Sequence, residues 1–211
     1  MGAKTWMLAI LEADAREVLA ARPMLDRDAA ARLAAELFPH EAQQALGDAD
    51  LSSTNPPDEY LHIGCFPGVS IVAAIDFALD RPSELPPHFL QVAGSRTVVL
   101  HAMHSVVDWF AFAVWRDGKL ERSLSLAPDN GIVENIGPPM AFELPFWNGE
   151  HPAVDPEDDD EDEPPYPFPF HPLELGEAAL SEFFGYQLEG IFDATLLDPE
   201  TVPLARYERI K

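Results

Sequence analysis

The segment Arg96–Leu126 constrains the fold of this chain more than any other segment, because it holds two runs of strand length joined by a hairpin signal. The runs are Trp109–Trp115 and Lys119–Leu126. Between them, Asp117-Gly118 favours a tight turn, since glycine tolerates positive φ and aspartate tolerates the position before it. The first run is apolar on both parities, which predicts a strand covered on both faces. The second alternates, with one arginine as the exception, which predicts a half-buried strand.

Other segments predict further strands and several short helices. Apolar runs of strand length predict strands at Lys4–Leu11, Tyr60–Phe66, Val69–Phe77 and Arg96–Met103, and a short irregular one within Gly131–Leu144. Capping residues and apolar positions at helical spacing predict helices; these begin at Asp14, near Asp26, near Ser83, at Glu174 and at Asp198-Pro199. Gly47–Glu59 is expected to be a polar loop. We therefore expect an α+β fold with a mainly antiparallel central sheet, packed by N-terminal helices and a C-terminal helix.

The composition changes sharply at Glu150–Pro172, which contains seven of the 21 prolines together with a run of acids. Like charges repel one another, and proline favours an extended backbone, so the pattern predicts a mobile acidic insert at about 150–172. The whole chain of 211 residues has enough apolar content to bury one core. We expect a single domain over 1–211, interrupted by this insert.

The net charge of −24 indicates which partners the chain favours. Asp155 and the run Glu157–Glu163 supply eight acids, which leaves −16 on the remainder of the chain. Direct nucleic-acid binding is disfavoured, because it depends on lysine and arginine meeting phosphates. A basic protein partner fits this charge, and so does solubility alone, which is the commoner reason for it.

The expected location is the cytoplasm, without membrane contact. The sequence lacks a run of about 18 apolar residues of the kind that spans a bilayer. Its N-terminus lacks the basic-then-apolar layout of a secretory signal. The single cysteine, Cys65, excludes an internal disulfide and fits a reducing compartment. Cys65 is expected to be a buried apolar residue, with a nucleophile activated by a nearby histidine as the alternative.

His101, His104 and Asp108 form the pattern H-x-x-H-x-x-x-D, which contains zinc-ligand types. On a helix these spacings would align all three side chains, but the surrounding sequence favours a strand. On a strand, His101 and His104 point to opposite faces, and a turn would let Asp108 fix the His104 tautomer. We therefore expect no metal and no cofactor here, and keep the three residues as weak candidate ligands.

Ser125, Glu134 and Asn135 are the second group of candidate site residues, because they form part of a polar sequence that leaves the hairpin. Asp129-Asn130-Gly131 between them is a turn signal. The functional alternative is a cleft at the hairpin end that these side chains line. Neither a nucleophile-elbow serine motif nor a glycine-rich phosphate loop occurs in the sequence.

Several motifs together resemble a family of uncharacterised actinobacterial proteins. The motifs are MGAKTWML, FPGVSIV, DRPSELPPHFL, LHAMHSVVDWFAFAVW, SLSLAPDNGIVENIG and PFPFHPLELGEAAL. The resemblance extends over the chain except for the acid-rich insert. The family is classed as a domain of unknown function, so the resemblance implies no reaction, cofactor or substrate.

Two function classes remain open at this point. The first is a non-catalytic, acidic cytoplasmic interaction protein that binds a basic protein partner. The second is a small hydrolase or metal-dependent enzyme that uses the His101-His104-Asp108 region. The sequence contains no complete catalytic motif, which favours the first class slightly. The oligomeric state is not indicated.

Overall fold

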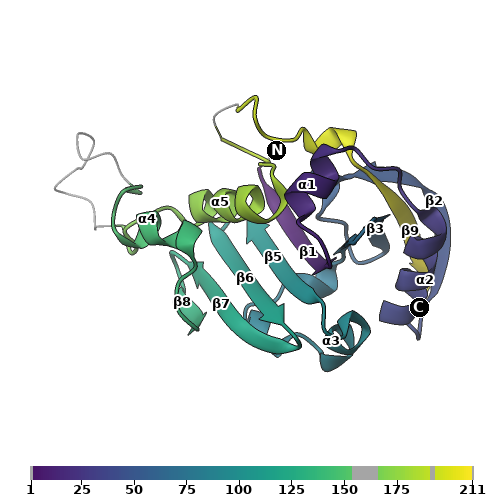
Figure 1. Cartoon of the computed structure of the whole chain (residues 1–211). Helices are drawn as coiled ribbons and strands as arrows, with labels where there is room; N and C mark the ends of the chain where they lie inside the picture. Colours follow the sequence, from purple (N-terminus) through teal and green to yellow (C-terminus); the bar gives the residue numbers. More distant parts are fainter. Residues whose placement is uncertain (1, 154–165, 191–192, 211) are drawn as a thin grey trace.

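The computed structural model describes residues 2–153, 166–190 and 193–210, and its central feature is an antiparallel sheet of nine strands (Figure 1). The strand order is β2-β9-β3-β4-β1-β5-β6-β7-β8, so the first strand of the chain lies in the middle of the sheet. The bounds are β1 Lys4–Leu11, β2 Ala42–Asp50, β3 Tyr60–Phe66, β4 Val69–Ala73, β5 Thr97–His104, β6 Trp109–Arg116, β7 Lys119–Ala127, β8 Gly131–Ile136 and β9 Pro203–Ile210.

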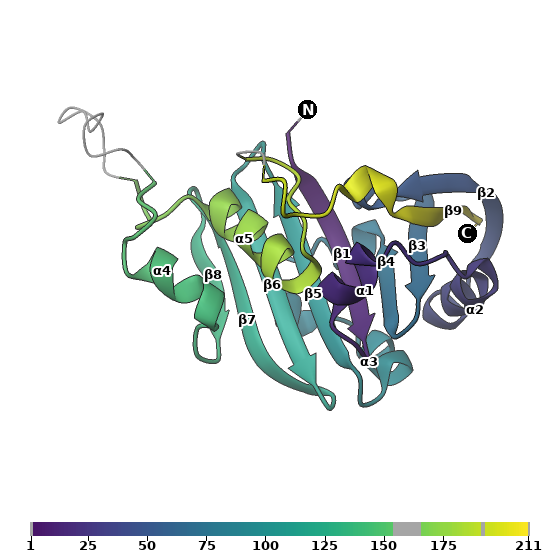
Figure 2. The same ribbon diagram turned by 45° about the horizontal axis from the view of Figure 1, so that its top comes forward.

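Helices cover both faces of the sheet (Figure 2). One apolar core lies between the sheet and helices α1 and α5, and a second lies between the sheet and helices α2 and α3. The α+β fold with an antiparallel sheet, packed by N-terminal helices and a C-terminal helix, is therefore confirmed. The helices are α1 Ala15–Ala20, α2 Arg27–Leu37, α3 Pro87–Ala93, α4 Leu144–Trp147 and α5 Pro172–Phe184.

The N-terminal segment folds as its sequence predicts. β1 has the predicted bounds, and the Asp14 side chain then caps α1 by accepting hydrogen bonds from the backbone N–H groups of Arg16 and Glu17. Asp26 caps α2 in the same way through Ala29 N–H. These carboxylates satisfy N–H groups that a helix leaves without internal partners. The apolar stripe of α2 is buried against the sheet: Ala30, Leu33, Ala34 and Leu37.

The hairpin at 109–126 is also confirmed, as β6 and β7. Asp117 and Gly118 both adopt positive φ, at 49° and 70°, which is the geometry of a tight hairpin turn. β6 is buried on both faces, as its double apolar pattern predicts. Its even positions contact the core beneath α5, whereas Ala113 and Trp115 contact the core on the α2 side.

Two strands were absent from the sequence-based prediction. The prediction of a loop at Gly47–Glu59 is wrong at its start, because β2 extends to Asp50. The short helix predicted at Asp198-Pro199 is only the 3₁₀ turn Pro199–Thr201, and the chain then forms β9. β2 is an edge strand whose side chains are mostly exposed, so its sequence does not alternate between apolar and polar residues. Backbone pairing with β9 holds it in the sheet. β9 contains three charged residues, Arg206, Glu208 and Arg209, which interrupt the apolar alternation that would have indicated a strand.

Two smaller predictions also need correction. The helix expected from Ser83 begins only at Pro87, because Ser83 lies in a separate 3₁₀ turn, Pro82–Glu84, where its side chain binds Glu134. The strand expected at Val69–Phe77 ends at Ala73 and continues into a 3₁₀ turn.

The insert expected at 150–172 falls partly outside the described residues, which omit 154–165. In its described part, Phe168 and Phe170 are buried in the core beneath α5. In the ranges that the structure describes, no helix has the length and apolar content needed to cross a membrane.

Candidate functional site

His101 joins helix α5 to the sheet. Its side chain is fully buried on β5, where Nδ1 lies 2.6 Å from the Thr5 hydroxyl and Nε2 lies 3.0 Å from the Gly176 carbonyl oxygen. The neutral tautomer with a proton on Nε2 satisfies both contacts, since it donates to the carbonyl and accepts from the hydroxyl. Burial lowers the His101 pKa to about 4, so the ring is neutral at pH 7. Both nitrogens therefore have partners within the fold.

His104 and Asp108 do not form the pair considered from the sequence. His104 lies on the opposite face of β5 from His101, stacks on Trp6 and accepts a hydrogen bond from Val106 N–H at 3.2 Å. Asp108 Oδ2 instead lies 3.6 Å from Nε2 of His171, the residue that caps α5. A histidine and a carboxylate do meet here, but the histidine comes from a distant segment. Among the described residues, no group of three histidine, cysteine or acidic side chains is arranged to hold a metal ion.

Ser125, Glu134 and Asn135 are divided between the two faces of the sheet. Ser125 accepts a hydrogen bond from the Trp109 indole at 3.1 Å, and the buried Glu134 accepts hydrogen bonds from Ser83 and Ser123. Asn135 points to the other face, where its side-chain oxygen accepts a hydrogen bond from Arg122. The bonds of Glu134 fasten the turn at Pro82–Glu84 to β7 and β8.

Arg122, the exception in the alternating strand, forms a buried ion pair with Glu143. Two N–H groups of the guanidinium donate to the two carboxylate oxygens at 2.8 and 2.6 Å, and both side chains are at most 1% exposed. The third guanidinium nitrogen donates to Asn135 Oδ1 at 2.6 Å. Glu143 also accepts from Met140 N–H and from the Trp147 indole. The charges are thus fully paired, as a buried pair requires.

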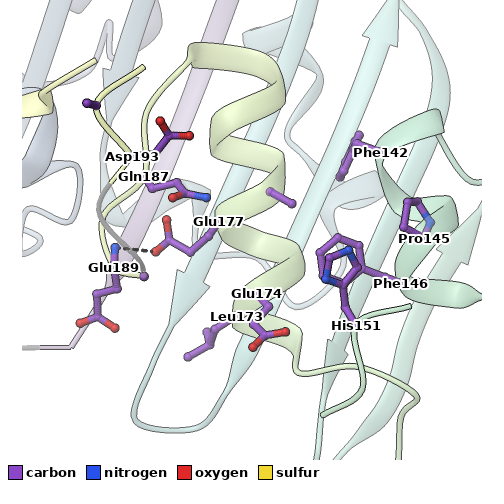
Figure 3. A pocket seen from close by; sticks show the side chains of 13 residues that line it. Phe142, Pro145, Phe146, His151, Leu173, Glu174, Glu177, Gln187, Glu189 and Asp193 are labelled. Carbon is purple, nitrogen blue, oxygen red and sulfur yellow. Dashed lines mark hydrogen bonds between the residues drawn. The ribbon is translucent and has the colours of Figure 1, made fainter. Parts of the chain in front are cut away.

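A cleft of about 870 Å³ opens beside α5, away from all six residues singled out in the sequence. Figure 3 shows its two sides, which differ in chemistry. None of the described lining residues is lysine or arginine. On one side of α5 lie Phe142, Pro145, Phe146 and His151, and on the other lie Glu177, Gln187, Glu189 and Asp193, with Leu173, Glu174 and Ala178 on the helix between them.

Glu177 is the buried carboxylate of this cleft, at 8% exposure. Its two oxygens accept hydrogen bonds from the backbone N–H groups of Leu188 and Glu189, at 2.8 and 3.1 Å. Burial, with a smaller contribution from the nearby charge of Glu189, outweighs these two bonds and raises the Glu177 pKa to about 7. The carboxyl is therefore close to half ionised at neutral pH.

The other acidic side chains of the cleft are exposed. Asp193 accepts hydrogen bonds from the backbone and hydroxyl of Thr195, which lower its pKa and keep it ionised. Glu174 and Glu189 face solvent. Across the helix, the His151 ring stacks on Phe146 with centroids 4.4 Å apart. The cleft thus combines exposed carboxylates with an aromatic wall.

No local sequence pattern indicates this cleft, because its lining comes from segments that are far apart in the chain. Residues from Phe142–His151, Leu173–Ala178, Gln187–Gly190 and Asp193–Ala194 meet around α5 in the folded chain. One signal was available: Glu177 directly follows Gly176, which the helical spacing places on the inward face of α5. The lone cysteine points to no second site, since Cys65 is buried and burial raises the pKa of its thiol.

The protein is thus an acidic α+β protein with a nine-stranded antiparallel sheet and an open, carboxylate-lined cleft beside its C-terminal helix. The chain belongs to the Family of unknown function (DUF6928), whose model matches residues 5–207. No curated protein matches the chain, and no solved structure does.

Proposed function

We propose that this protein is a non-catalytic, acidic interaction protein that binds a basic protein partner, and that the cleft beside α5 is the docking site. The observation that carries the proposal is the lining of the cleft, with four carboxylates from Glu174, Glu177, Glu189 and Asp193, and without lysine or arginine. A pocket that combines apolar walls with a few polar groups is typical of binding sites.

The charge of the whole chain supports the same proposal. A net charge of −24 produces a negative field that attracts basic proteins and accelerates their association. The aromatic wall then offers apolar contact area beside the charged side, which resembles the anatomy of protein interfaces. A cytoplasmic location is part of this proposal, supported by the single, free cysteine.

The proposal does not rely on the His101-His104-Asp108 region. His101 is buried with both ring nitrogens bonded, and His104 lies on the opposite face of the strand. A nucleophile or general base needs access to a substrate atom, which this buried ring lacks. The hydrolase alternative therefore has no observation in its favour at that position.

Binding of a fluorescent peptide of alternating leucine and lysine tests the proposal, with a leucine–glutamate peptide as the negative probe. The cleft variant E174Q/E189Q/D193N removes three exposed charges from the cleft. The matched variant E36Q/E84Q/D129N removes three exposed charges elsewhere. We expect the cleft variant to weaken binding about tenfold or more and the matched variant about twofold, since screened distant charges contribute less.

Salt separates local docking from general attraction. Raising the salt concentration from about 50 to 200 mM should weaken binding, because it shortens the Debye length. Equal losses in the two triple variants would show that the charge acts without the cleft. Binding of the acidic peptide as tight as that of the basic one would contradict the proposal altogether.

A further inference from the structure

We infer that the cleft selects a partner segment in which a lysine or arginine lies beside an apolar side chain, and that Glu177 is the residue that selects the positive charge. This inference rests on the proposed function and specifies the chemistry of its partner. The inferred selectivity is more specific than attraction by the net negative charge of the protein, because the two sides of the cleft have separate roles and one carboxylate has a particular role.

The two sides of the cleft match the two parts of such a segment. Phe142 and Pro145, which are half-buried, and the buried Phe146, on which His151 stacks, form the apolar lining on one side of α5, and the carboxylates lie on the other side (Figure 3). Leu173 and Ala178 line the helix between them. A volume of about 870 Å³ falls in the range of ligand sites and holds a few side chains. A purely basic segment would leave the aromatic wall uncovered, and a purely apolar one would bury the carboxylates without a partner.

Glu177 differs from the other three carboxylates of the cleft in its burial: it is 8% exposed, whereas Glu174, Glu189 and Asp193 are exposed to solvent. Its oxygens accept hydrogen bonds from two backbone N–H groups, but among the described residues no cation acts on its charge. Among the described residues that line the cleft, the other charged or titratable groups are acidic or, like His151, lie on its far side, and the buried phenol of Tyr186, whose pKa burial raises, also interacts with Glu177. Glu174 lies one turn earlier on α5, Glu189 and Asp193 lie on the following segment, and His151 lies beyond the helix. A lysine or arginine side chain would supply the missing charge.

Binding of a cation at Glu177 is expected to release a fraction of a proton. The Glu177 pKa is about 7 in the free protein, so the carboxyl carries about half a proton at pH 7. A cation beside it favours the ionised form and lowers that pKa. Binding should therefore release up to about half a proton at pH 7 and should be tighter at higher pH, by linkage. An anionic ligand would have the opposite effect.

Three peptides distinguish the contributions of charge and apolar contact. The first carries a phenylalanine beside a lysine, the second replaces the lysine by norleucine, and the third replaces the phenylalanine by serine. Isothermal titration of the full chain at pH 7, in two buffers of different ionisation enthalpy, measures both affinity and proton release. We expect the first peptide to bind about tenfold or more tightly than either analogue, and to release a proton fraction that the norleucine peptide does not.

Variants assign the proton. E177Q should abolish the release and the roughly five- to tenfold gain in affinity between pH 6 and pH 8 that follows from a pKa near 7. E182Q, an exposed position on α5 outside the cleft, should retain both. H151Q should retain the release, which excludes the histidine as its source. Thermal unfolding of each variant verifies that it is folded. The three peptides are compared on the wild-type chain, so that comparison remains valid even if E177Q fails to fold.

Three outcomes would overturn the inference. Tight binding of the phenylalanine–lysine peptide without proton release would show that Glu177 does not meet the charge, while leaving the proposed function intact. Equal affinities for the lysine and norleucine peptides would show that the cleft does not select a positive charge. Absence of binding by any basic peptide would overturn both the inference and the proposed function.

Discussion

Glu143 and Glu177 are two buried carboxylates on the same side of the sheet, and the fold treats them differently. Glu143 is fully buried and has a complete set of partners: two N–H groups of Arg122, Met140 N–H and the Trp147 indole. Glu177, at 8% exposure, has two backbone N–H donors and borders an open cleft. The Glu143 charge is neutralised by Arg122 within the fold, so its role is structural. Glu177 borders an open cleft, where the positive charge of a ligand could pair with it.

The largest expected effect on stability comes from breaking the buried ion pair of Arg122 and Glu143. Arg122→Met should destabilise the protein by about 3–5 kcal/mol, because it leaves Glu143 buried without a cation. Urea unfolding at pH 7 measures this loss. The double variant R122M/E143L should recover most of it, because replacing both partners removes the unpaired charge. A double variant as unstable as the single one would contradict the desolvation explanation.

The second effect concerns pH and Glu177. Its pKa rises from 4.5 to about 7 on folding, so the folded state holds the proton more tightly and wild-type stability falls as pH rises through this range. E177Q lacks this dependence. Its stability relative to the wild type should increase by about 2–3 kcal/mol between pH 5 and pH 8. Urea unfolding at both pH values measures the change, and a constant difference would show that Glu177 titrates normally.

A smaller effect is expected where α5 meets the sheet, at the residue before Glu177. A Cβ on Gly176 would lie 2.8 Å from Met103 Sδ and 3.1 Å from the Phe110 ring. Gly176→Ala should therefore cost about 1–3 kcal/mol by overpacking. It should also disturb the bond between His101 and the Gly176 carbonyl. Unchanged thermal stability would show that the helix can shift without loss.

The smallest effect is expected at an exposed ion pair of the same hairpin. Arg116 lies 3.1 Å from Glu121, and both side chains are about half exposed. Arg116→Ala should change stability by at most about 1 kcal/mol, because solvent screens the pair. Comparison with Arg122→Met isolates the effect of burial. A loss of stability in Arg116→Ala as large as that in Arg122→Met would contradict the explanation that burial makes the difference between the two ion pairs.

Patterns within single segments predicted much of the fold. β1, the caps at Asp14 and Asp26, the turn at Asp117-Gly118 and helix α5 follow from apolar periodicity and turn chemistry. β2 and β9 were missed because their side chains carry little periodic signal. β2 is held mainly by backbone pairing, and the buried Arg209 of β9 depends on Glu41 and Asp76, which are distant in sequence.

The site was harder to predict than the fold. The polar residues of the hairpin stood out in the sequence, yet His101, Ser125 and Glu134 bind partners inside the fold. Glu177 stood out less, because a glutamate on a helix is ordinarily solvated. Its burial results from the segment Tyr186–Gly190 returning over α5, which is a tertiary contact that no local pattern encodes.

The pKa of Glu177 is the most direct test of the difference between the two carboxylates. Carbon-detected NMR of the glutamate side chains across pH 4–9, with E177Q to assign the signal, measures it in the free and peptide-bound protein. Glu177 should titrate near 7 in the free protein. With the phenylalanine–lysine peptide bound, its pKa should fall by about one pH unit or more, because the cation stabilises the carboxylate. Titration near 4.5 in both states would contradict the role assigned to Glu177.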